Sequence, residues 1–462
     1  MDSKNEFGGV HLDVGLGQQK ATPRMPGDPF RIAILGDFGG QASKLTPVAV
    51  DCDNFDQVLK SLGVTLELPV AGKISFRELD DFHPDRLYER VGLFEPLRQA
   101  LATAKPIAQK ASRAGSSVAP ALRTSSLLDD MVQAAERPEV AAPRDPLRAW
   151  VSEQTAPHLT PKVPAADFER RELVKGVIAA QMRALLHYPE LQQLEALWRS
   201  IAFLVKRCVS YSQVSIHLIN IGRQNLARDL SEGPGEIAKL LHDRGPWAVV
   251  VGAYNFGAAK PDLQLLTALG ELSGGLNASF IGAANPQLVG CENIEKLAEP
   301  REWTAPSLDW DEFRSTAAAK YVGLAMPRFL VRLPYGAKTD PCEVISFEEM
   351  GDEHDHERLL WGNPAIVCAA LLAASFGEDG WSMRAGKHSN LDDLPTYVYQ
   401  QDGDFVAQPC AETIMTERGA KAIQDCGVMC LASIKDTDEV RLVRFQCSSK
   451  VLGPLPGPWM HV

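Results

Sequence analysis

The chain has 462 residues, of which 45% are hydrophobic and 23% are charged. This is enough for several domains with sizeable cores, and the composition is that of a globular protein. The 47 basic and 59 acidic residues give a formal net charge of −12. An acidic chain without a basic run is a poor partner for nucleic acid or an anionic membrane, so neither is expected. No apolar stretch approaches the roughly 18 residues that span a bilayer, and no secretory signal opens the chain, so we expect no membrane insertion.

The N-terminal part predicts a small α/β domain at residues 29–104, after a polar and flexible N-terminus at 1–28. Its strands are indicated by β-branched or alternating apolar patterns, and its helices by capping residues followed by apolar spacing. The predicted elements are a strand at 30–35, an extended piece at 47–51, a helix opening at 53, strands at 64–68 and 73–79, and a helix after 85 that ends near 104.

Residues 105–165 change in composition, because proline, alanine and serine replace most of the apolar pattern. Such a segment is typical of a linker, with short helices such as one at 126–132. It separates the small domain from the rest of the chain.

A larger α/β body is predicted at 166–447, followed by a Pro/Gly-rich tail at 448–462. Two helices meet at a break at 187–189, and buried strands then alternate with helices, which favours a parallel βαβ unit. The predicted elements are strands at 214–220, 248–252 and 279–283, helices within 227–241, at 263–278 and at 365–376, an extended piece at 328–332, and short strands near 397–399 and 440–445. The fold class is therefore α/β, of the mixed α+β kind.

The candidate metal ligands are the nine cysteines and an acidic cluster that contains two histidines. Cys426 and Cys430 lie close together but lack a second ligand pair, so we expect reduced core thiols. His354 and His356 alternate with carboxylates at 352–357. A solvated acidic loop explains this cluster better than a metal site, and a metal-dependent enzyme using the two histidines remains the alternative of a different class.

Catalytic motifs are not found. Gly36–Gly40 follows a strand but fits no phosphate-binding loop, and neither a G-x-S-x-G elbow nor an H-E-x-x-H helix occurs. The acid pair Glu348–Glu349 has no supporting pocket signal. We therefore predict no catalytic, cofactor-binding or metal-binding residue, no cofactor, and no enzyme activity.

Residues 166–447 resemble the large subunit (TssC/VipB) of the contractile sheath of bacterial type VI secretion systems. The string Pro-Arg-Phe-Leu-x-Arg-Leu-Pro-Tyr-Gly at 327–336 is highly specific. The segments that carry the resemblance are His187–Arg199, Ala253–Phe256, Lys320–Gly336 and Leu360–Ala365.

Residues 29–104 resemble the small sheath subunit (TssB/VipA) more loosely, through Asp51–Val58 and Phe76–Asp85. The chain thus looks like a small subunit fused to a large one. Ser126–Asp129 resembles the start of the large subunit's N-terminal helix. The residues that we single out as family motifs with structural or assembly roles are Trp198, Pro327, Arg328, Phe329, Arg332, Pro334, Tyr335, Gly336, Trp361, Gly362, Asn363, Asp80, Asp81 and Phe82.

The resemblance implies a structural component of a contractile sheath in the bacterial cytoplasm, which assembles around an inner tube and contracts to drive effector delivery. Its implied partners are other sheath subunits, further copies of itself, the inner tube protein, baseplate components and the sheath-disassembling AAA+ ATPase. An accessory protein that caps or joins the sheath or baseplate is the alternative. The family's C-terminal segment has no match here, and three prolines near the end disfavour a strand. We therefore expect that the chain alone builds no long tube.

Within this resemblance, side-chain roles follow from residue type. We expect Phe329, Leu330 and Leu333 to pack in the core, and Arg328 and Arg332 to pair with carboxylates. Trp198 is expected to be a core anchor of its helix rather than an interface hot spot.

Overall fold

The computed structural model describes residues 24–103 and 165–460, apart from 26, 41–44, 232, 234, 293, 295–296 and 352–353. The described residues form two compact units, one of 24–94 and 178–460 and one of 95–103 and 165–177. The predicted linker, with its short helix at 126–132, lies outside the described residues except for residue 165. Most of the predicted flexible N-terminus lies outside them too.

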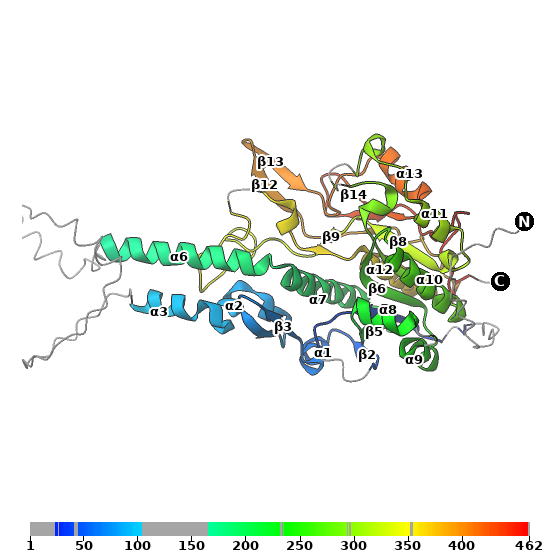
Figure 1. Ribbon diagram of the computed structural model, residues 1–462, viewed down its shortest axis with the longest axis horizontal. Coiled ribbons are helices and arrows are strands. Elements are labelled where there is room, and N and C mark those ends of the chain that lie inside the picture. The colour runs from blue at the N-terminus through cyan, green and yellow to red at the C-terminus, as the bar shows by residue number, and fades with distance from the viewer. Residues whose placement is uncertain are drawn as a thin grey trace, which may run out of the picture. The chain divides into compact units, whose positions relative to one another are not determined.

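The larger unit is built on a mixed sheet, which has nine strands in the part of the chain described. The strand order is β11-β15-β14-β8-β7-β6-β1-β5-β2 (Figure 1). The strands are β1 (Phe30–Gly36), β2 (Val48–Val50), β5 (Val214–Asn220), β6 (Val249–Phe256), β7 (Ser279–Ala284), β8 (Val322–Met326), β11 (Asn390–Leu391), β14 (Met429–Ser433) and β15 (Val440–Leu442).

Strand β1 lies inside this sheet, between β5 and β6, and is parallel to both. Phe30 is in register with Val214 along β5, and Ile32 is in register with Val249 along β6. A parallel strand that is paired at both edges and covered on both faces carries mostly apolar residues, and β1 is apolar except for Arg31. The N-terminal segment and the body therefore share one sheet and one core within this chain.

The predicted βαβ unit is confirmed. β6 and β7 are parallel, and α10 (Lys260–Gly275) connects them. β7 continues the parallel arrangement to β8. The α/β fold class is confirmed as well, with antiparallel strands at both ends of the sheet.

Helices cover both faces of the sheet, since successive side chains of a strand point to opposite faces. Ala33 and Leu35 join a core cluster with side chains of α8 (Arg223–Ser231), α9 (Glu236–Arg244) and α10. Phe30, on the other side of β1, packs against Phe376 of α12 (Pro364–Asp379) at 5.0 Å between ring centroids. α12 in turn contacts α7 (Pro189–Cys208). On the face that carries Ala33 and Leu35, α11 (Leu308–Arg314) and α13 (Glu417–Asp425) add side chains to the same core cluster.

Smaller elements flank the sheet. Two hairpins are formed by β3 (Thr65–Leu68) with β4 (Gly72–Ser75) and by β12 (Tyr397–Gln401) with β13 (Asp404–Gln408). The short strands β9 (Phe329–Leu330) and β10 (Trp361–Gly362) pair with each other. The remaining helices of the larger unit are α1 (Phe55–Leu62), α2 (Pro84–Arg90) and the 3₁₀ turns at 79–82, 92–94, 286–289, 300–302, 318–321, 356–358 and 380–382.

Several predicted elements differ in extent, and the largest differences concern three of them. The strand predicted to run to 79 ends at Ser75, and the long helix predicted after 85 is interrupted by an extended residue at Val91. The helix predicted within 227–241 is two helices, α8 and α9, because extended Gly235 lies between them. β8, β14, α11 and α13 were not predicted.

The smaller unit contains α3 (Glu95–Thr103) and the first part of α6 (Ala165–Leu186), whose remainder belongs to the larger unit. α3 has no buried residue, and its Arg98 pairs with Glu95 one turn earlier. Among the described helices, none combines the length and apolar character needed to cross a bilayer.

Candidate functional site

The family-motif string at 327–336 runs through the interior of the larger unit. Pro327 is buried directly after β8. Phe329 and Leu330 are fully buried in β9, which pairs antiparallel with Trp361 and Gly362 of β10. Leu333 is half-buried. The apolar members of the string therefore hold this segment in the core.

Arg332 lies at the centre of a buried charge cluster, which we define as Arg332, Glu195, Glu349, Arg199 and Tyr335. Its guanidinium donates to Glu195 Oε1 at 2.7 Å and Oε2 at 3.2 Å, and to Glu349 Oε2 at 2.7 Å and Oε1 at 3.0 Å. Both carboxylates are at most 1% exposed. Two bidentate pairs on one guanidinium give the geometry that makes arginine a strong partner of carboxylates.

The other members of the buried charge cluster satisfy the remaining polar atoms. Arg199, one turn after Glu195 on α7, donates to Glu195 at 2.7 Å and to the Tyr335 hydroxyl at 2.7 Å. The backbone N–H of Tyr335 donates to Glu349 at 2.7 Å, and His187 Nε2 lies 3.4 Å from Glu349. The cluster thus ties α7 to the string and to the loop that ends at Glu349.

The electrostatics of the cluster favour the charged forms. Burial opposes ionisation of Glu349, but Arg332 and His187 overcome it and lower the pKa of that carboxyl to about 2. Burial also opposes ionisation of Glu195, and Arg332 and Arg199 likewise lower its pKa. Burial and the neighbouring Glu195 raise the pKa of Tyr335, so its hydroxyl stays protonated. Two arginines and two carboxylates balance, and their mutual bonds clamp α7 to the string.

Arg328, which is partly exposed, forms a second ion pair at the start of the string, with the buried carboxylate of Glu412. Its backbone N–H donates to Glu412 at 2.7 Å, its Nε donates to the same carboxylate at 2.8 Å, and its Nη2 reaches Glu357 at 3.2 Å. His356 Nε2 is 3.1 Å from Glu412. Burial opposes ionisation of Glu412, yet His356 and Arg328 lower its pKa. Both arginines of the string therefore pair with carboxylates, as the sequence predicts.

Close approaches explain the glycines of the motif. A Cβ at Gly336 would collide with the carboxylate of Glu348, which accepts a hydrogen bond from the Ala337 N–H at 3.0 Å. A Cβ at Gly362 would collide with Val331 and with Phe329 at 2.7 Å. At Gly336 the exposed Glu348 side chain can swing aside, whereas at Gly362 a larger residue would push against buried Phe329 and displace the string.

The remaining motif residues fix neighbouring segments. Asn363 caps α12 by accepting from the Ala365 N–H at 2.9 Å. Trp361 is 7% exposed and donates to the His356 carbonyl at 2.9 Å, and Pro334 is buried.

Trp198 is fully buried on α7 and contacts the N-terminal segment. Its indole donates to the Phe38 carbonyl at 3.3 Å, and its ring meets Phe55 edge-on at 5.8 Å. It therefore packs as a core anchor.

Asp80, Asp81 and Phe82 lie in the 3₁₀ turn before α2. Asp81 is 2% exposed and accepts from the Arg77 N–H and from Arg90, while Phe82 stacks on Phe76 at 4.1 Å. Asp80 is exposed, and its carbonyl accepts from the His83 N–H. These residues shape the chain that leads into α2.

The structure separates the two histidines considered as metal ligands. His354 stacks on Tyr399 with ring centroids 3.7 Å apart, whereas His356 bonds Glu412 and packs on Trp361. Cys426 and Cys430 are free thiols, and burial raises the pKa of both, that of Cys430 to about 12. Neither pair belongs to a group of three metal-type ligands within the described residues.

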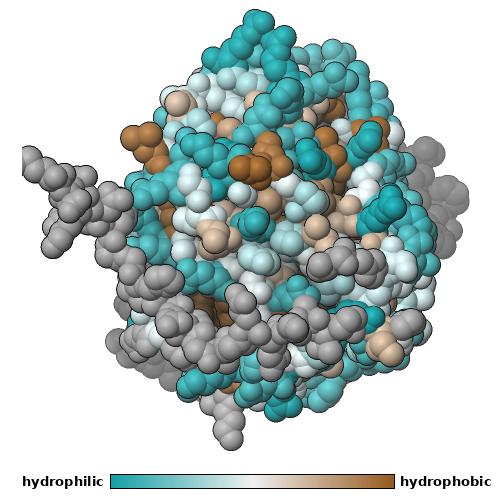
Figure 2. Space-filling view, turned by 90° about the vertical axis from the view of Figure 1, so that its right-hand side faces the viewer, coloured by the Kyte–Doolittle hydropathy of each residue, from teal (hydrophilic) through white to brown (hydrophobic). Residues whose placement is uncertain are grey.

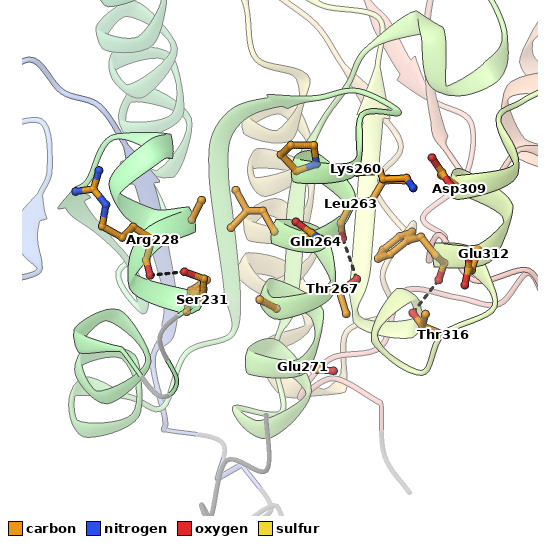
Figure 3. A pocket seen from close by; sticks show the side chains of 16 residues that line it. Arg228, Ser231, Lys260, Leu263, Gln264, Thr267, Glu271, Asp309, Glu312 and Thr316 are labelled. Carbon is orange, nitrogen blue, oxygen red and sulfur yellow. Dashed lines mark hydrogen bonds between the residues drawn. The ribbon is translucent and has the colours of Figure 1, made fainter. Parts of the chain in front are cut away.

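A groove of about 710 Å³ opens between α8, α10 and α11 (Figure 3). Its floor is apolar, with side chains such as Leu230, Leu263 and Phe313. The three labelled hydroxyl side chains each donate to a backbone carbonyl one turn back: Ser231 to Arg228, Thr267 to Leu263, and Thr316 to Phe313 (Figure 3). These hydroxyls are therefore engaged, and the groove presents no activated nucleophile among them.

Sequence reasoning missed the acidic partners of both arginines of the string. Glu195 is 137 positions from Arg332, and Glu412 is 84 positions from Arg328, so no local spacing links them. One available signal was the spacing of Glu195 and Arg199 on one helical face. Glu349 was noted only as half of an acid pair.

Comparisons with known proteins cover both halves of the chain. Residues 172–448 match the VipB family model, described as the EvpB-type tail sheath N-terminal domain, and residues 10–136 match the type VI secretion system VipA model. The type VI secretion system sheath protein TssC1 of Pseudomonas aeruginosa is 32% identical over 295 residues, which cover 59% of each chain. The chain thus spans about three-fifths of the length of this relative. Since the VipB model covers more than half of it, the chain belongs to the VipB tail sheath family.

Proposed function

We propose that this protein is a structural subunit of a type VI secretion contractile sheath, which carries the small and the large sheath parts in one chain. The observation that supports this most is the place of β1. It comes from the VipA-matched residues and pairs on both edges with strands of the VipB-matched residues.

A covalent fusion has a simple physical consequence. Two parts that would otherwise have to meet at the concentration of free subunits are held together at a fixed ratio of one to one. The buried charge cluster and Trp198 add long-range contacts within the same unit. The larger unit of each subunit would then behave as a single folded body.

A sheath needs one repeated contact between subunits. Head-to-tail contacts give an open helical filament when their rotation does not close into a ring. Contraction would then be a change between two packings of rigid subunits rather than a chemical step. We propose no catalytic role for any residue of this chain.

The partners follow from this function. We propose self-association with other sheath subunits, contact with the inner tube and the baseplate, and recognition by the disassembling AAA+ ATPase. We propose that the protein functions in the bacterial cytoplasm.

Figure 2 shows one face of the protein, on which apolar side chains lie in small groups between hydrophilic ones. Surfaces of this mixed kind are usual for contacts that form between folded subunits. We therefore expect neighbours to add to a folded unit.

Sedimentation and negative-stain electron microscopy test the proposal. The purified chain is examined alone and after co-expression with the other tail proteins of its source bacterium. We expect the chain to sediment with helical tubes, and a label attached to the chain to appear along the whole length of each tube. Label confined to tube ends would support the capping alternative instead. A chain that stays monomeric and unbound in every mixture would contradict both.

A further inference from the structure

We propose that His83, Asp85 and Cys342 form a binding site for a divalent metal ion of the zinc class. One ligand atom of each residue lies within 4.8 Å of the others, and all three residues are half-buried. His83 and Asp85 come from the VipA-matched residues, and Cys342 comes from the VipB-matched residues. The proposal is independent of the proposed sheath function.

The backbone around the site is already organised. Asp85 accepts from the backbone N–H groups of Glu343 at 2.7 Å and Val344 at 3.1 Å, directly after Cys342. A carboxylate oxygen that accepts one hydrogen bond keeps a second lone pair, so Asp85 can still bind a cation. These contacts hold the cysteine segment beside the start of α2.

The histidine is held as well. The His83 ring meets Tyr335 edge-on at 4.9 Å, and one nitrogen accepts from the Asp85 N–H at 3.2 Å. Its other nitrogen lies 3.8 Å from Asp340. Tyr335 belongs to the buried charge cluster, so the site rests against the most rigidly bonded part of the string.

The charge around the thiol favours a cation. The carboxylates of Asp85, Asp340, Glu349 and Glu348 place negative charge around the Cys342 thiol. A divalent ion would offset this negative field and stabilise the thiolate. No metal is needed to explain the fold, so the ion would act as an additional clip between the two segments.

The ligand set selects the metal. Thiolate, imidazole and carboxylate together are typical of Zn²⁺, which binds them at about 2.0–2.3 Å in tetrahedral geometry. Ligand atoms in such a site are about 3.3–3.8 Å apart, so the three side chains need to close by roughly 1 Å. Asp340 or a water molecule would complete the tetrahedron.

Cobalt titration of the full-length chain under reducing, oxygen-free conditions tests the site. We expect one Co²⁺ per chain, a thiolate-to-cobalt charge-transfer band in the near ultraviolet, and loss of that band when Zn²⁺ is added. Cys342→Ser and His83→Asn should each weaken binding by at least about tenfold. Asparagine is chosen at 83 because it can still cap α2.

Matched variants and a measurement on the unmodified chain make the result decisive. Cys52→Ser changes an exposed cysteine outside the site and should leave binding unchanged. In the unmodified chain, Zn²⁺ should slow alkylation of Cys342 but not of Cys52, as read by mass spectrometry. Equal binding by Cys342→Ser, loss of the band in His354→Ala, or equal alkylation of Cys342 with and without Zn²⁺ would overturn the proposal.

Discussion

Replacing Arg332 by methionine removes the centre of the buried charge cluster while nearly preserving side-chain length. Glu195 and Glu349 would each lose two hydrogen bonds and stay buried at 1% exposure or less. Breaking a buried ion pair by removing one partner costs about 3–5 kcal/mol. Arg199 still neutralises Glu195, and His187 still lies beside Glu349, so we expect the lower end, about 3 kcal/mol.

Urea denaturation measures this loss. The denaturant slope in urea is about 1–3 kcal/mol/M for small proteins and rises with size, so for this chain the midpoint should fall by up to about 1 M. Lys421→Met, which breaks an exposed pair with Asp425, should change the midpoint little. Adding Glu349→Gln to Arg332→Met removes the unpaired charge and should restore part of the loss. A midpoint for Arg332→Met equal to that of Lys421→Met would refute the assignment of the cluster as a clamp.

Three further predictions follow from the same contacts. The pKa of Glu349 falls from 4.5 to about 2 on folding, so its contribution to stability is complete above about pH 4.5 and is lost as the pH falls toward 2. The stability of Glu349→Gln should therefore fall less steeply than that of the unmodified chain between pH 4.5 and pH 2, as urea midpoints measure. Gly362→Ala should destabilise the chain by about 1–3 kcal/mol through clashes with Val331 and buried Phe329, whereas Gly92→Ala, whose Cβ would meet no atom within 4 Å, should not, as calorimetry can compare. A chain cleaved at a protease site introduced between residues 104 and 164 should elute as one complex in size-exclusion chromatography, because β1 stays paired with β5 and β6; separate fragments without denaturant would contradict this.

Much of the secondary structure could be predicted from the sequence, because local patterns determined it. The apolar run of β1, the alternation of β5 and the strand–helix–strand succession of β6, α10 and β7 are visible without a structure. By contrast, the five residues of β8 are all buried and carry glycine and alanine, so no alternation marks them. A strand of this kind can be identified from the strands that pair with it in the structure, here β7 and β14, but not from its own sequence.

The position of β1 and the partners of the arginines could not be predicted. The residues of β1 favour a strand in any sheet, and only pairing across more than 180 positions places it between β5 and β6. Arg332 was expected to find carboxylates, but Glu195 and Glu349 are identified only by the packing of α7 against the string. The predicted division of the chain into parts at 29–104 and 166–447 stays a prediction, and strands from both parts share one sheet.

The most direct test of the whole account is a cryo-electron microscopy reconstruction of tubes assembled with this chain. The account predicts that every wall subunit contains this chain, with Phe30–Gly36 lying between Val214–Asn220 and Val249–Phe256 of the same molecule. Tubes whose walls lack the chain, or a strand at that place donated by a neighbouring molecule, would contradict it.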